Sequence, residues 1–135
     1  LYDFHKTIGI TILAIVLARL IYRLRNGAPA ADPSLPPVLV GVSHLTHWAI
    51  YALLVAVPLV GYVGTSYYGA LSVFGVPLVA LTAKDEKYSE SVFELHEALA
   101  FALLALIAIH IVAAIYHKLI RKDRVVERML PKRTV

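Results

Sequence analysis

The chain has 135 residues, of which 59% are hydrophobic, and it carries a formal net charge of +4. Soluble domains average about 45–50% apolar residues, so this composition excludes an ordinary soluble domain and favours a membrane protein. Cysteine is absent, which excludes disulfides, iron–sulfur clusters and thiolate-bound metals. Any bound metal or cofactor must therefore be held by nitrogen or oxygen ligands.

Three long apolar blocks predict three helices that span a membrane. A hydrocarbon core about 30 Å thick needs roughly 20 apolar residues in helical form, and each block with its flanks reaches that length. We place the helices at about residues 4–24, 42–63 and 92–120 of a single transmembrane domain that covers residues 1–135. The expected fold class is an all-α membrane protein, a transmembrane helix bundle.

The connections between the blocks differ in character. Residues 28–37 hold four prolines and predict a loop. Residues 65–90 predict a long connection, with a short helix on the membrane face where the apolar run 71–81 lies. Ser91 and Glu94 have the spacing of a capping box, which predicts that the third helix begins there.

Basic residues predict the orientation in the membrane. Lysine and arginine gather after the first block and after the third, whereas the connection 65–90 carries few. The positive-inside rule then puts the first connection and the C-terminus in the cytoplasm, and it explains the basic residues without a nucleic-acid partner. The chain begins without Met, and we expect one further helix upstream, giving four spans in the full-length protein.

The six histidines are the main functional signal, because ionisable residues inside a span are costly. His96 and His110 are 14 residues apart, so they share one helix face and are about 21 Å apart along the axis. Two stacked haems fit that spacing. His5 lies at the depth of His96 and can pair with it, whereas His110 needs either a histidine from an upstream helix or His47.

The residues one turn after each histidine rank the candidates. A flat macrocycle needs small side chains there, and Gly9 follows His5 at that position. Ala100 follows His96 and Ala114 follows His110, but the bulky Trp48 follows His44 and Tyr51 follows His47. His5, His96 and His110 therefore rank as iron ligands, with Gly9 beside the cofactor, and His44 and His47 rank lower.

Three further residues are candidates for the cofactor's polar edge. Arg19 lies 14 residues after His5 and Arg23 one turn later, where a guanidinium can pair with a haem propionate. Both side chains can instead snorkel to the membrane interface. His117, at the membrane surface, can neighbour a propionate, a quinone headgroup or water.

Short motifs along nearly the whole chain complete the pattern. They are His5-Lys6-Thr7-Ile8-Gly9, Arg19-Leu20-Ile21-Tyr22-Arg23, His44-x-x-His47-x-x-x-Tyr51, Pro58-x-x-Gly61, Phe74-Gly75 with Pro77, His96-Glu97-x-Leu99-Ala100, His110, His117 and Arg128-Met129-Leu130-Pro131. In this order and spacing the chain resembles the bacterial cytochrome b-561 family of small di-haem cytochromes of the inner membrane.

That resemblance implies a four-helix bundle with two b haems and oxidation of superoxide with ubiquinone as acceptor. It also implies that His5 pairs with His96 at the outer haem, and His110 with a histidine on the first helix. Expected partners are membrane lipid, quinone, and a small electron donor or a peripheral redox subunit.

The favoured hypothesis is a membrane cytochrome that passes electrons from an outer-face donor to quinone. One alternative is the cytochrome b anchor subunit of a hydrogenase or dehydrogenase complex; another is a proton or ion transporter that uses the histidines as a relay. The outer connection has two lysines against four acids up to Glu94, which does not give the positive funnel that would speed capture of superoxide.

Overall fold

Three long helices dominate the computed structural model, which describes residues 1–27, 33 and 35–121. Helix α1 covers Tyr2–Asn26, α2 covers Pro37–Tyr68 and α3 covers Glu86–Tyr116, and a short π-helix, η1, continues it over His117–Arg121. Each of α1, α2 and the α3–η1 segment is long and apolar enough to cross a membrane. The predicted all-α membrane architecture with three spans is confirmed.

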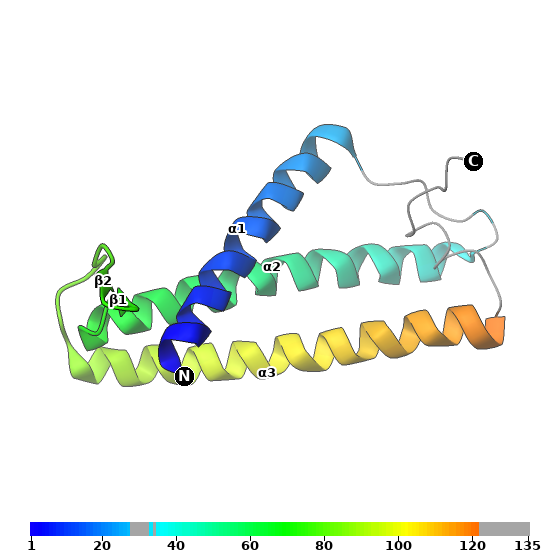
Figure 1. Ribbon diagram of the computed structural model, residues 1–135. Helices are drawn as coiled ribbons and strands as arrows, with labels where there is room; N and C mark the ends of the chain where they lie inside the picture. Colours follow the sequence, from blue (N-terminus) through cyan, green and yellow to red (C-terminus); the bar gives the residue numbers. More distant parts are fainter. Residues whose placement is uncertain (28–32, 34, 122–135) are drawn as a thin grey trace.

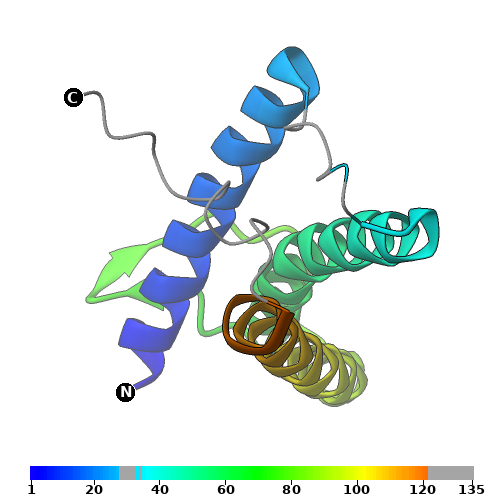
Figure 2. The same ribbon diagram turned by 90° about the vertical axis from the view of Figure 1, so that its right-hand side faces the viewer.

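The helices are not packed equally against one another. Helices α2 and α3 run antiparallel and side by side, while α1 crosses α2 and its C-terminal end leans away (Figures 1 and 2). Among the described residues, α1 has no close backbone contact with α3. The rings of His5 and His96 meet between these two helices, with their centres 6.0 Å apart.

The ends of two helices differ from the predicted ones. Helix α2 begins at Pro37 rather than near residue 42, because proline suits the first position of a helix. It continues to Tyr68 rather than 63, and Gly69 then ends it at a φ of 81°, a left-handed conformation that glycine adopts readily.

The expected loop at residues 28–37 is mostly outside the described residues, as is the chain from Lys122 onward with its basic tail and the motif at 128–131.

The predicted start of the third helix is wrong. Asp85 caps α3, since its side chain accepts hydrogen bonds from the backbone N–H groups of Lys87 at 3.1 Å and Tyr88 at 3.3 Å. A satisfied cap at this position starts the helix earlier than the spacing of Ser91 and Glu94 indicated. Ser91 therefore lies inside α3 rather than at its end.

A β-hairpin replaces the short helix expected in the second connection. Strands β1, Ser72–Val73, and β2, Val76–Pro77, pair antiparallel. Phe74 and Gly75 between them have φ values of 48° and 80°, as in the tight turns that match the twist of two strands. The prediction failed because a short apolar run broken by glycine and proline fits a strand as well as a helix.

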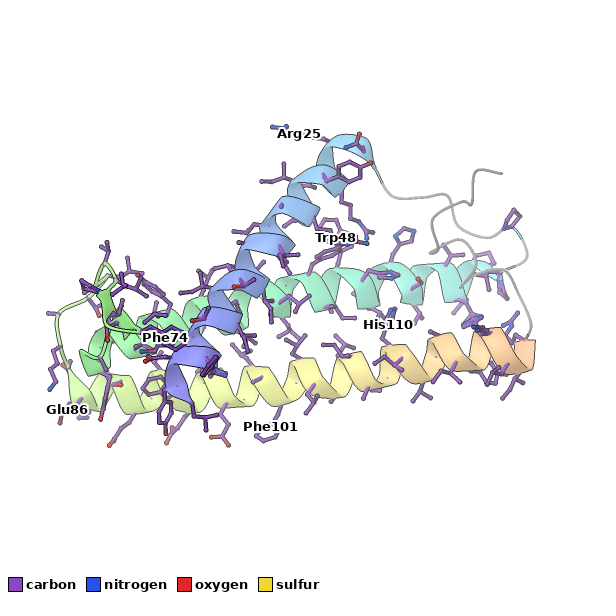
Figure 3. The ribbon with its side chains drawn as sticks, viewed as in Figure 1. Arg25, Trp48, Phe74, Glu86, Phe101 and His110 are labelled. Atoms are coloured by element: carbon purple, nitrogen blue, oxygen red, sulfur yellow. The ribbon has the colours of Figure 1, made fainter. Side chains whose placement is uncertain are left out.

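Few side chains are buried in the described part of the chain. Val16 and Tyr51 are its only buried hydrophobic residues, and side chains project outward from all three helices (Figure 3). Where α2 and α3 meet, Ser89 donates a hydrogen bond of 3.2 Å to the carbonyl of Gly64. Small residues at such contacts let membrane helices approach closely, and lipid covers the remaining apolar surface.

Candidate functional site

His5 of α1 and His96 of α3 face each other across the space between those helices. Their ring centres are 6.0 Å apart and their planes are nearly perpendicular, at 86°. Bonds from imidazole nitrogens to a metal are about 2 Å long, so two rings on one metal ion have centres about 6 Å apart. The structure thus gives this pair the spacing of two axial ligands on one iron.

The ring of His96 is held by the backbone of α2. Its Nδ1 lies 2.9 Å from the carbonyl oxygen of Val57, and because a carbonyl only accepts, Nδ1 carries the proton and Nε2 keeps its lone pair. A Cβ added at Gly61 would lie only 2.9 Å from Cε1 of His96. The histidine ring therefore packs where α2 has no side chain.

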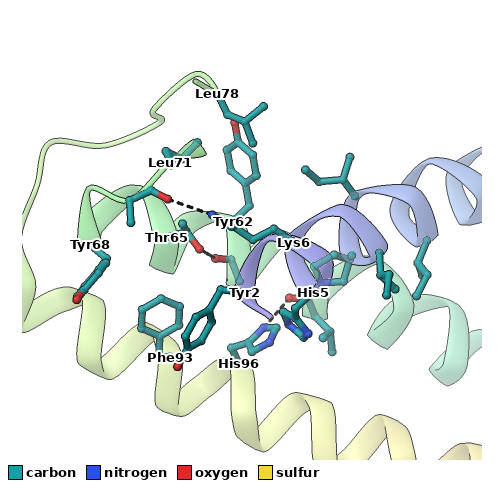
Figure 4. Close-up of a pocket in the computed structure, with 18 of the residues that line it drawn as sticks. Tyr2, His5, Lys6, Tyr62, Thr65, Tyr68, Leu71, Leu78, Phe93 and His96 are labelled. Carbon is teal, nitrogen blue, oxygen red and sulfur yellow. Dashed lines mark hydrogen bonds between the residues drawn. The ribbon is translucent and has the colours of Figure 1, made fainter. Parts of the chain in front are cut away.

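Cavities lie beside this histidine pair. One, of about 830 Å³, is bounded by α1, α2, α3 and the residues on either side of the hairpin, with His5, His96, Phe93 and Leu71 among its walls (Figure 4). Ligand cavities typically measure about 300–1,000 Å³ and are mostly apolar. A second, of about 580 Å³, is lined by His5, His96, Ala100 and other residues of α1 and α3. Both cavities thus border the rings of His5 and His96.

The hairpin is joined to the start of α1 by two kinds of contact. Lys6 Nζ donates to the carbonyl oxygen of Ser72 and forms an ion pair of 2.9 Å with Asp3. The ring of Phe4 meets the edge of Phe74 at a centre distance of 5.2 Å. These contacts tie the first turns of α1, which carry His5, to the hairpin.

A second pair of rings lies at the other end of the bundle. The centres of His47 and His110 are 5.2 Å apart and their planes meet at 72°. Ser43 Oγ is 3.4 Å from Nδ1 of His47. The two histidines belong to α2 and α3, which lie side by side, and both rings are half-buried. Sequence analysis ranked His47 low, but the structure places it against His110.

Both candidate arginines contact α2 close to His47. Arg19 donates a hydrogen bond from Nε to the hydroxyl of Tyr51 at 3.0 Å. The guanidinium of Arg23 lies over the rings of Trp48 and Tyr51, 5.5 and 5.4 Å from their centres, a cation–π arrangement. Tyr51 is one turn from His47 on α2, so two cationic groups gather beside the second histidine pair.

The remaining predicted residues lie in different surroundings. Gly9 lines the larger cavity, and a Cβ there would make ordinary contact with Pro58 at 3.9 Å. His44 is exposed on α2, and His117, the first residue of η1, has its ring centre 6.1 Å from that of Tyr116. The structure therefore groups Gly9 with His5 and His96 at the larger cavity.

Sequence reasoning missed the contribution of Val57 and Gly61 to the setting of His96. The available signal was the glycine inside an otherwise apolar helical pattern, which usually has a packing reason. Its partner could not be identified, because the contact joins residues far apart in the chain.

The donor set fits haem better than a bare metal ion. Among the described residues, no three histidine or acidic side chains converge as a metal-binding group, whereas structural and catalytic metal ions take three or four protein ligands. Haem iron needs only one or two. Facing imidazoles beside apolar cavities thus match the needs of this cofactor.

Comparison with known proteins identifies the family of the chain. The family model described as prokaryotic cytochrome b561 matches residues 1–132. A Yersinia pestis protein named "Probable superoxide oxidase" is 30% identical over 96% of this chain and 74% of its own length. Two cytochrome b561 homologues of Escherichia coli K12 are 29% and 32% identical, each over 96% of this chain, and the matches cover 74% and 70% of their lengths.

Proposed function

Because the chain belongs to the prokaryotic cytochrome b561 family, we propose that it moves electrons between a donor at the outer face of the membrane and a quinone within it. The family is one of multi-pass membrane cytochromes b, which bind haem b and serve electron transfer. The observation that carries the proposal is the facing of His5 and His96, whose ring centres are 6.0 Å apart next to an apolar cavity of about 830 Å³.

The residues of this outer site have separable tasks. His5 and His96 offer nitrogen ligands from α1 and α3. The Val57 carbonyl accepts the hydrogen bond of His96 Nδ1–H, and this leaves Nε2 available as the ligand atom. The apolar walls exclude water. Haem held by these two histidines would supply reversible one-electron transfer.

We assign one ligand of an inner haem to His110. His47 is the nearest candidate for the other, but it and His110 lie on adjacent, packed helices, and their ring centres are only 5.2 Å apart. A macrocycle between them would have to separate α2 from α3. A histidine on a further helix, opposite α3, meets no such obstacle and is the ligand we favour.

The arginines and His117 would serve the polar edge of the inner haem. Arg19 uses only Nε on Tyr51, so its other guanidinium N–H groups remain able to bind a propionate. Arg23 adds a second positive charge nearby. We assign His117, at the end of α3, to the quinone headgroup or a propionate, with ubiquinone as the acceptor.

Charge at the outer end bears on the identity of the donor. The connection 65–90 and the start of α3 carry two lysines against four acids up to Glu94, and Lys84 is paired with Glu86 at 3.0 Å. This favours a peripheral redox subunit over a small anion, although superoxide is the substrate named for the Yersinia relative. In either case we place the chain in the bacterial inner membrane with its C-terminus in the cytoplasm.

The test is the reaction of the purified full chain with quinone. Chemically reduced protein in detergent should show the absorbance of a low-spin b haem, and added ubiquinone should reoxidise it at a rate that rises with quinone concentration. A colourless sample would favour the histidine-relay transporter. Reduced haem that is stable towards quinone would contradict the proposed acceptor.

A further inference from the structure

The ring of His96 contacts the backbone of α2 at two neighbouring positions. Its Nδ1 meets the carbonyl oxygen of Val57 at 2.9 Å, and its Cε1–Nδ1 edge lies over Gly61, where a Cβ would come within 2.9 Å and 3.0 Å of those two atoms. Val57 and Gly61 are four residues apart, so they lie on the same face of the helix. We call these two backbone positions the His96 seat.

No side chain larger than hydrogen fits at Gly61 without moving the ring. Separations under about 3.4 Å are tighter than ordinary van der Waals contact, so alanine at this position must push the imidazole away by several tenths of an ångström. The same displacement lengthens and misaligns the Nδ1 hydrogen bond, which weakens steeply away from good geometry.

We propose that Gly61 is a positioning residue for the outer haem: the His96 seat fixes the tautomer, the ring plane and the electron donation of the His96 imidazole. The proposal rests on the proposed function, since it takes His96 as an iron ligand. A hydrogen bond from Nδ1–H makes the opposite nitrogen a stronger donor, and a stronger donor favours ferric iron. The seat therefore holds the potential of the outer haem low.

The ring planes give the proposal a spectroscopic signature. The planes of His5 and His96 meet at 86°. Low-spin ferric haem with perpendicular axial imidazoles has a strongly anisotropic electron paramagnetic resonance signal at low field, whereas parallel planes give a three-line rhombic signal. The outer haem, identified as the signal lost in His96→Ala, should belong to the first type.

The experiment compares Gly61→Ala with the wild-type full chain in membranes. The outer haem should shift to a higher midpoint potential and change its resonance signal, or its occupancy should fall, since loss of such outer contacts lowers metal affinity about 10–100-fold. A tenfold change in the ferric-to-ferrous preference corresponds to about 59 mV. An unchanged signal, potential and occupancy would overturn the proposal.

Gly64 provides a matched control one turn further along α2. A Cβ there would lie 2.9 Å from Cε1 of Phe93, so Gly64→Ala brings a clash of the same size against a phenyl ring. Because Phe93 lines the larger cavity, haem occupancy is not the readout of this control, but the haem that binds should keep the wild-type signal and potential, since the His96 seat is intact. Equal changes in both variants would show that helix packing, rather than the seat, is responsible. Gly41→Ala, with nothing within 4 Å, is the neutral reference.

A double variant keeps the test decisive if Gly61→Ala does not accumulate. Gly61→Ala combined with His96→Ala removes the ring that alanine would strike, so it should accumulate as well as His96→Ala alone. Failure of the double variant to recover would overturn the seat. A wild-type sample without haem would contradict the proposed function instead, while this comparison of protein levels would still measure the contact.

Discussion

The two histidine pairs differ in the helices that hold them. The outer pair, His5 and His96, joins α1 to α3, which have no close backbone contact among the described residues, and cavities of about 830 and 580 Å³ lie beside it. The inner pair, His47 and His110, joins α2 to α3, which are packed side by side. We therefore propose that facing rings are not sufficient and that a haem also needs a gap between the helices that supply its ligands.

The comparison also separates two uses of charge. Near the inner pair, Arg19 and Arg23 converge on Tyr51, and in the described residues neither makes an ion pair with a carboxylate. Near the outer pair, Lys6 is already paired with Asp3. An anionic propionate is thus better provided for at the inner site, while the outer site relies on apolar enclosure.

The largest expected effect is the loss of one haem when its histidine ligand is replaced. His96→Ala should remove the outer haem and His110→Ala the inner one, each leaving the other's α-band and potential in a redox titration followed by absorbance. His44→Ala is the control, because His44 is exposed, and it should keep both haems. Loss of both haems in each single variant would contradict two separate sites.

The next effect tests the inner pair itself. His47→Ala should retain the inner haem, because we assign its second ligand to a further helix, and haem content per protein should match wild type. Loss of the inner haem as complete as in His110→Ala would show that α2 and α3 separate to admit it. A gap between the helices in the present structure would then not be required for a haem site.

A smaller effect is expected from the inner cations. Arg19→Gln removes a positive charge that disfavours ferric relative to ferrous iron. The inner haem's midpoint potential should therefore fall, by an amount equivalent to about 1 kcal/mol or less for a partly exposed charge. Arg25→Gln, at the exposed end of α1, should change it less. Equal shifts in both variants would indicate a general surface charge rather than a propionate contact.

The smallest effect concerns the outer charges. If superoxide reduces the outer haem at all, the excess of acids around Lys84 and Glu86 should repel it, and added salt should screen that repulsion. The reduction rate measured by stopped-flow should therefore rise modestly with ionic strength. A rate that falls as salt is added would reveal a positive approach path.

Much of the fold could be predicted, because the length and apolar composition of a segment are enough to identify it as a membrane span. His5 and His96 face each other, as the equal depth of their positions in the sequence predicted, whereas the ligand role of His110 stays a prediction. The starts of α2 and α3 did not follow, because the proline at the first position of α2, Pro37, and the cap of α3, Asp85, compete with other reasonable signals nearby.

The side-chain contacts between helices could not be predicted from the sequence. The hydrogen bond from His96 to Val57 and the space at Gly61 depend on the register of α3 against α2, which no local pattern specifies. The same holds for Arg19 and Tyr51: the sequence placed a bulky ring one turn after His47, but not the guanidinium that binds it. The hairpin at 72–77 was missed because each strand has only two residues.

The pairing of His5 with His96 is the central claim, and one measurement addresses it directly. Reduced-minus-oxidised spectra resolved by potential should be recorded for His5→Ala and His96→Ala in the full chain. We predict that both substitutions remove the same haem component and leave the other intact. Loss of different components, or of none, would contradict a shared iron between α1 and α3.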